Sequence, residues 1–133
     1  MEKLTSAMEN YLEAIYELSG GNSGVRVSDI SEKMGVTKAS VNNAMSILAS
    51  KGLVVSEKYK EVFLTDAGLK QAQLTSKKHY TIFKFFTEIL KIDKDIADKD
   101  ACRIEHVISN DSICAMHEFM QAYQNTKDTN TDC

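Results

Sequence analysis

The sequence predicts a mainly α-helical protein with one small β-hairpin, and three observations favour this fold class. No proline occurs among the 133 residues, so the commonest interruption of a helix is missing. Apolar residues recur at three- and four-residue steps in several segments, which is typical of amphipathic helices. Only one pair of short β-branched runs, at residues 53–56 and 62–64, has the pattern of strands.

The first predicted helix covers residues 4–18, whose apolar positions lie opposite a polar stripe. Turn-forming residues at 19–24, three of them glycines, end this helix. Ser28 is expected to cap a second helix of about two turns. Thr37 is expected to cap a third helix that ends near residue 50. The N-terminal third of the chain is therefore predicted to hold three helices.

The predicted hairpin joins its two strands through a charged loop at residues 57–61. Thr65 and Asp66 are expected to cap a long helix to about residue 90, which is apolar on two sides near its end and should pack against two neighbours. Two further helices, capped by Asp93 and by Ser109 or Asp111, should end near residues 108 and 123. The polar segment 125–133 is predicted to be a disordered tail.

Two short helices joined by a glycine-containing turn and followed by a hairpin form the pattern of a winged helix-turn-helix. The third helix carries small and amide side chains on its outer face, so it can approach the major groove, and an Asn there can pair with an adenine edge. Its N-terminus and the hairpin loop can contact phosphates. The alternative is a helical core with a solvated hairpin. The predicted DNA-contacting residues are Thr37, Lys38, Ala39, Ser40, Asn42, Asn43, Lys58, Tyr59 and Lys60.

The net charge of −3 argues at first sight against a nucleic-acid partner, because phosphates attract positive charge. The charges are unevenly distributed, however. Residues 70–91 carry five lysines and one glutamate, whereas residues 92–133 carry four basic and nine acidic side chains. This asymmetry suits a central anion-binding surface flanked by segments that concentrate cations.

Thiol, carboxylate and imidazole groups share one face of the fifth predicted helix. Asp98, Cys102, Glu105 and His106 stand at i, i+4, i+7 and i+8, close enough for two or three of them to bind one divalent ion. A polar, solvated helix face is the alternative for any one of them alone. Further ligands can come from the long helix and from the first helix, through His79, Asn10 and Glu13.

Several segments of the chain resemble the diphtheria toxin repressor family of metal-dependent transcriptional regulators. They are residues 8–18, the helix-turn-helix, Gly52-Leu53-Val54 leading into the hairpin, the segment 64–68, the Lys78-His79 pair and the segment Ala101-Cys102-Arg103-Ile104-Glu105-His106-Val107-Ile108-Ser109. The resemblance spans about residues 4–123, and the last segment is its most specific part. It implies a winged-helix DNA-binding domain at residues 1–70 and a helical metal-binding and dimerisation domain at residues 71–124.

The resemblance also implies a set of metal ligands. In the family, position 10 is usually Met or Asp, so the Asn amide of this chain is a departure. Glu13 and His79 match second-site ligands of the manganese-sensing branch, whereas Cys102 matches the iron-sensing branch. The implied ligands of the primary site are Asn10, Cys102, Glu105 and His106.

The ancillary site of the iron-sensing branch is not expected in this chain. Phe83 replaces a carboxylate that the iron-sensing branch uses there, and Asp98 replaces a histidine. Neither Mn²⁺ nor Fe²⁺ is favoured by the donor atoms alone, because thiolate suits softer ions and carboxylate suits Mn²⁺. The cofactor is therefore expected to be a divalent transition metal, Mn²⁺ or Fe²⁺.

These features predict a metal-dependent transcriptional repressor that controls metal-ion homeostasis. Loaded with Fe(II) or Mn(II), it is expected to bind palindromic operator DNA as a homodimer. The alternative is a redox-sensing winged-helix regulator that uses Cys102, although this leaves Glu105 and His106 unexplained. We expect no enzymatic activity, since no separate general base or substrate loop is evident. Without a bilayer-spanning run or a secretory signal, the protein is expected in the cytoplasm, with no membrane partner.

Overall fold

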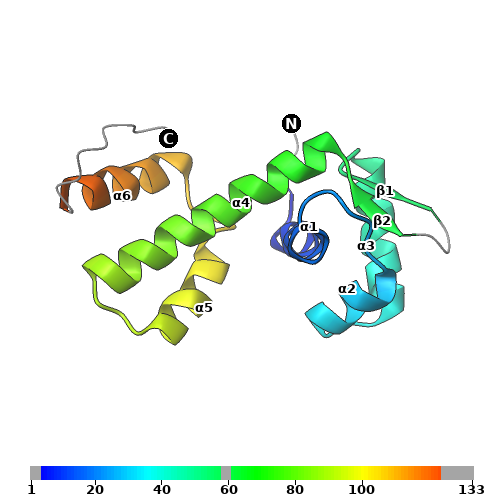
Figure 1. The fold of residues 1–133 in the computed structure, drawn as a ribbon, viewed down its shortest axis with the longest axis horizontal. Coiled ribbons are helices and arrows are strands. Elements are labelled where there is room, and N and C mark those ends of the chain that lie inside the picture. The colour runs from blue at the N-terminus through cyan, green and yellow to red at the C-terminus, as the bar shows by residue number, and fades with distance from the viewer. Residues whose placement is uncertain (1–3, 58–60, 124–133) are drawn as a thin grey trace. The chain divides into compact units, whose positions relative to one another are not determined.

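The computed structural model describes residues 4–57 and 61–123 and confirms the mainly α-helical fold class (Figure 1). The predicted disordered tail at 125–133 lies outside these residues. The chain forms two compact units, Met1–Leu74 and Thr75–Cys133. None of the described helices is both long and apolar enough to cross a bilayer.

The first unit begins with three helices, α1 (Ser6–Ser19), α2 (Val27–Met34) and α3 (Lys38–Ser50). The α3 helix begins where the sequence predicts, because the Oγ1 atom of Thr37 accepts a hydrogen bond from the backbone N–H of Ser40 at 3.1 Å. The predicted cap of α2 at Ser28 is wrong. Arg26 occupies the N-cap position without a side-chain hydrogen bond. The backbone of Val25 pairs with Val62, so the chain stays extended up to Arg26 and the helix begins directly after it.

The hairpin consists of β1 (Val54–Ser56) and β2 (Val62–Leu64), which pair antiparallel with Val55 opposite Phe63. In the first unit α1 packs on α2 and on β2, and α3 packs on α2 and on β1, as Figure 1 shows. Alternate residues of the short strands point inward and join the helices in one core. That core includes the side of α3 opposite its small and amide side chains. It is formed by Leu12, Ile15, Ile30, Val41, Ala44, Met45, Leu48, Val54 and Val62.

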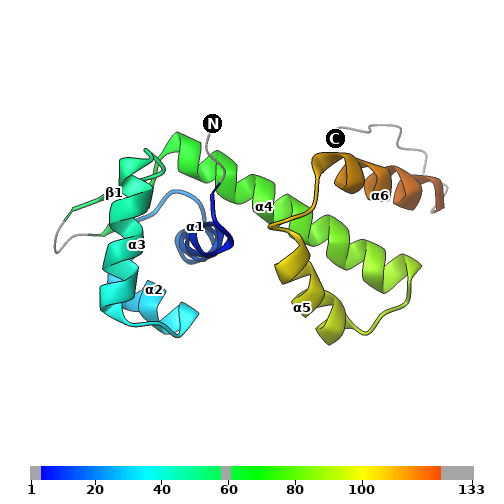
Figure 2. The same cartoon turned by 180° about the vertical axis from the view of Figure 1, so that it is seen from behind.

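The long helix α4 (Asp66–Lys84) passes into a π-helical turn, η1 (Phe85–Ile89), where the sequence predicts a continuous α-helix. The backbone N–H of Leu90 donates to the carbonyl of Phe85, five residues earlier, at 3.2 Å. Both α5 (Lys94–Ile104) and α6 (Asn110–Tyr123) contact η1. The views in Figures 1 and 2 place these two helices on different sides of the second half of α4, as expected for a helix that is apolar on two sides.

The caps of the last two helices agree with the sequence. Asp93 caps α5 by accepting a hydrogen bond from the N–H of Asp95, and Ser109 caps α6 by accepting one from the N–H of Ser112, both at 3.1 Å. However, α5 ends at Ile104, short of the predicted residue 108. The N–H groups of residues 107 and 108 both donate to the carbonyl of Ile104, which tightens the chain into a turn.

Candidate metal centre and nucleic-acid interface

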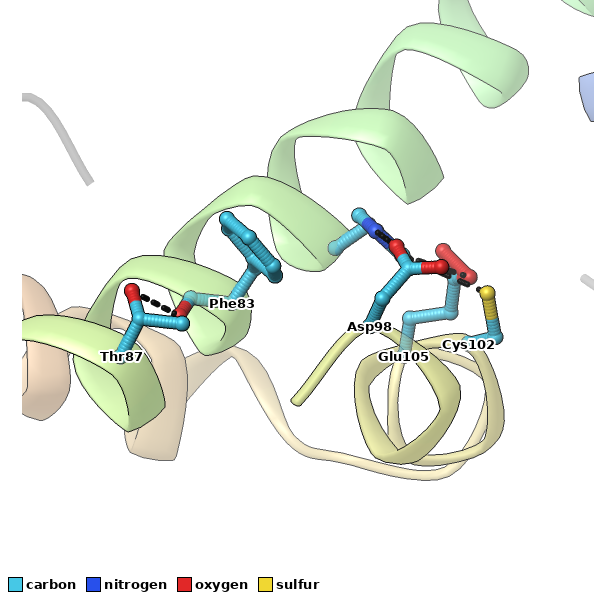
Figure 3. Close-up of polar contacts among 6 residues, drawn as sticks. Phe83, Thr87, Asp98, Cys102 and Glu105 are labelled. Atoms are coloured by element: carbon cyan, nitrogen blue, oxygen red, sulfur yellow. Dashed lines mark hydrogen bonds and ion pairs between the residues drawn. The ribbon is translucent and has the colours of Figure 1, made fainter. Parts of the chain in front are cut away.

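Three side chains on α5 and at its C-terminal end point toward α4 (Figure 3). Asp98 and Cys102 are four residues apart within the helix, and Glu105 follows three residues later at its C-cap. Residues at these spacings share one face of a helix. Because Glu105 keeps a right-handed helical backbone, it stays in line with the other two although α5 has ended.

His79 of α4 meets all three side chains. Its Nε2 atom lies 3.0 Å from Asp98 Oδ1, and its Nδ1 atom lies 3.4 Å from Glu105 Oε1 and 3.8 Å from Cys102 Sγ. Ligand atoms of His79, Asp98 and Cys102 all lie within 4.8 Å of one another. These four residues, all from the second unit, form a compact group that we call the His79 cluster.

The burial of Glu105 distinguishes the His79 cluster from an ordinary polar surface. The Glu105 side chain is 0% exposed, and its Oε2 atom has no hydrogen-bond partner among the described residues. A buried carboxylate with an unsatisfied oxygen is costly unless a cation or a donor compensates it. Imidazole, thiol and carboxylate are together a donor set that fits a divalent transition metal.

The charge of His79 is set by its acidic neighbours. The hydrogen bond to Glu105 raises the pKa of His79 to about 9, which outweighs the lowering caused by desolvation, and Asp98 raises it further. In the ion-free protein the imidazole is therefore protonated at neutral pH. A positive charge thus already occupies the position beside the buried carboxylate.

The structure brings together three of the six predicted ligands, namely His79, Cys102 and Glu105. His106 is buried in the same unit but lies outside the His79 cluster, and Asn10 and Glu13 lie on α1 in the first unit. Asp98 belongs to the cluster although the family resemblance gives it no role. The signal for Asp98 is its spacing of four residues from Cys102, which places both on one face of α5.

The predicted DNA-contacting face of α3 is accessible. Its side chains are exposed, whereas the opposite side of the helix is buried in the core of the first unit. The exposed residues are Thr37, Lys38, Ala39, Ser40, Asn42 and Asn43. The predicted contacts of the hairpin loop, Lys58, Tyr59 and Lys60, lie outside the described residues.

Comparisons with known proteins cover both units. Residues 3–62 match the family described as iron dependent repressor, N-terminal DNA binding domain. Residues 65–133 match the family described as iron dependent repressor, metal binding and dimerisation domain. Each description thus corresponds to one part of the chain.

Individual relatives agree with these matches. The HTH-type transcriptional regulator MntR of Shouchella clausii is 34% identical over 120 residues, which cover 90% of this chain and 83% of the relative. An uncharacterized HTH-type transcriptional regulator of Methanocaldococcus jannaschii is 28% identical over 122 residues, covering 91% and 98%. The solved structure of the manganese regulator SloR superposes with a TM-score of 0.75 at 29% identity, covering 89% of this chain. The chain spans 55% of the length of SloR.

Proposed function

This chain belongs to the diphtheria toxin repressor family of metal-dependent transcriptional regulators, and from this membership we propose that it represses transcription as a homodimer on palindromic operator DNA when loaded with Fe(II) or Mn(II). Its role is then the control of metal-ion homeostasis. The relatives are transcriptional regulators, and the proposal assigns no catalytic activity to the chain.

The buried Glu105 carboxylate is the observation that supports the metal-dependent part of the proposal. It lies at the base of the His79 cluster with one oxygen that has no hydrogen-bond partner among the described residues. A bound cation supplies the positive charge that offsets Glu105 and the acidic groups around it. Cys102 and His79 offer a sulfur and a nitrogen donor on the exposed side of the same carboxylate.

The proposal retains Asn10 and Glu13 of α1 and His106 of the second unit as further ligands, on the basis of the family resemblance. Ligands contributed by α1 would restrict the movement of the helix-turn-helix, of which α1 is a packing partner. In a symmetric dimer the two α3 helices must enter half-sites whose centres are roughly 34–36 Å apart, or a multiple of this. Among the conformations that the dimer samples, restricting α1 would favour the one that can bind DNA.

A binding titration tests the proposed function. Duplexes are selected from a random-sequence pool with the full chain in Mn(II), and the affinity for the selected duplex is then measured by fluorescence anisotropy in chelator and in Mn(II), Fe(II), Zn(II) and Co(II). We expect Mn(II) or Fe(II), or both, to tighten binding of the chain to the selected duplex about tenfold or more, equal to about 1.4 kcal/mol. Equal affinity in chelator and in every metal would overturn the metal switch.

A further inference from the structure

The two nitrogens of the His79 ring face different partners. Nε2 lies 3.0 Å from Asp98 Oδ1, whereas Nδ1 faces Glu105 Oε1 at 3.4 Å and Cys102 Sγ at 3.8 Å. These nitrogens stand on different edges of one rigid ring, so only one of them can bind a given ion. In this orientation of the ring, an ion on Nδ1 shares that edge with Glu105 and Cys102, and it leaves Nε2 to Asp98.

The Nδ1 side of the ring is the better place for a cation. It holds a thiol and the 0%-exposed Glu105, whose second oxygen has no hydrogen-bond partner in the described part of the chain. Among residues 4–57 and 61–123, the Nε2 side holds Asp98, and 58% of the Asp98 side chain is exposed to water, which compensates its charge. The donor count and the burial both favour Nδ1 as the metal-binding nitrogen.

We propose that Asp98 is a positioning residue for the metal centre: it accepts the Nε2 hydrogen of His79 and so holds the ring in the tautomer and orientation that turn Nδ1 toward Glu105 and Cys102. The inference rests on the proposed metal-binding function and deepens it. Carboxylates that accept the second N–H of a metal-binding histidine fix its tautomer and make the ligand nitrogen more basic.

Phe83, one turn after His79 on α4, restrains the same ring in a different way. Its ring is stacked on the imidazole, with centroids 6.4 Å apart and planes inclined by 9°. Stacking restrains the plane of the ring but does not distinguish its two edges. The hydrogen bond to Asp98 supplies that distinction, because only a nitrogen-bound hydrogen can donate to the carboxylate.

Cobalt titrations of the full chain separate a positioning role from direct coordination. The variants are Asp98→Ala, Asp98→Asn, which keeps an oxygen acceptor, and Asp95→Ala as a control that removes an exposed acidic group from the same helix. We expect Asp98→Ala to weaken Co(II) binding about 10- to 100-fold while the absorption spectrum at saturation, including the thiolate charge-transfer band, stays that of the wild type. Asp98→Asn should recover part of this loss, and Asp95→Ala should bind within about twofold of the wild type.

Long-range ¹H–¹⁵N spectra of the zinc-loaded, ¹⁵N-labelled protein test the tautomer directly. We expect the ring hydrogen of His79 to be bound to Nε2, and the ¹⁵N resonance of Nδ1 to be the one that the metal shifts. The reverse assignment would overturn the inference, as would a changed cobalt spectrum in saturated Asp98→Ala or equal affinities of Asp98→Ala and Asp95→Ala. A wild-type chain that binds neither Co(II) nor Zn(II) would instead overturn the proposed function together with the inference.

Discussion

The backbone of Gly68 lies directly against the carbonyl group of Leu53, leaving no room for a side chain. A Cβ atom at position 68 would stand 1.9 Å from the carbonyl oxygen. The same carbonyl accepts a hydrogen bond from the N–H of Thr65 at 3.1 Å, so it is held in place. This contact fixes the first turn of α4 against the chain that enters β1.

Substitution of Gly68 by alanine should therefore destabilise the protein. In an unobstructed helix the same change stabilises by about 1 kcal/mol. Here we expect a loss of about 1–3 kcal/mol in the free energy of unfolding, measured by urea denaturation, because backbone must shift to admit the methyl group. Ala67→Gly, at the exposed neighbouring position, measures the ordinary preference of this turn for alanine and should cost about 1 kcal/mol or less. A more stable Gly68→Ala protein would contradict the close contact.

Neutralising Glu105 should weaken metal binding without altering the shape of the site. Glutamine keeps the size of the side chain but removes the buried negative charge that a cation would offset. We expect Glu105→Gln to bind Mn(II) at least about tenfold more weakly, and the rise in melting temperature that Mn(II) causes in the wild type to shrink accordingly. The matched control is Glu118→Gln on α6, where the acid is exposed. If Mn(II) raises the melting temperature of Glu105→Gln as much as that of the wild type, Glu105 is excluded as a ligand.

The raised pKa of His79 predicts a pH dependence of stability in the ion-free protein. The folded-state pKa is about 9, above the ordinary 6.5, chiefly because of the hydrogen bond to Glu105. The stabilisation is therefore fully present below about pH 6.5 and is lost as the pH rises through about 9. With chelator present, the difference in unfolding free energy between the wild type and His79→Gln should be larger at about pH 6 than at about pH 10. A difference that does not change with pH would contradict the ion pair.

Two substitutions on α3 should affect DNA binding in different ways. Asn43→Ala should cost about 1–3 kcal/mol on the preferred operator and relax specificity at one base pair, because an amide that pairs with a base edge is lost. Lys38→Ala should weaken binding to all sequences alike and reduce the salt slope by about one. Both side chains are exposed, so unfolding free energies should stay near the wild-type value. Equal losses on specific and unrelated duplexes for Asn43→Ala would count against base reading.

Replacement of Cys102 by serine distinguishes metal sensing from redox sensing. If the thiol is one ligand among several, Cys102→Ser should lose more affinity for Fe(II), Co(II) and Zn(II) than for Mn(II), since sulfur favours softer ions. DNA binding should then still respond to Mn(II). A redox sensor would instead respond to peroxide through Cys102 and ignore chelator. Cys114→Ser, on α6, serves as the control.

The sequence predicted most helix limits because the signals that set them are local. Thr37, Asp93 and Ser109 each cap a helix through a hydrogen bond to a residue two or three positions away. The error at α2 has a distant cause, the pairing of Val25 with Val62, which no local pattern reveals. The hairpin was predictable from its β-branched runs, while its bridge to the segment before α2 was not.

The candidate metal centre was predictable in its composition but not in its geometry. Spacing along one helix face brought Asp98 and Cys102 into consideration, and His79 of the long helix was already a candidate ligand from the sequence. Which nitrogen of His79 faces which acid depends on a side-chain orientation and on the packing of α4 against α5. Such relationships arise only in the folded chain.

The π-helical turn at Phe85–Ile89 changes which residues share a face at the end of the long helix. Each hydrogen bond that spans five residues encloses one residue more than an α-helical one, so the chain beyond Phe85 is advanced by one position relative to an unbroken α-helix. A helical wheel drawn through the whole of 66–90 assigns faces correctly only as far as Lys84.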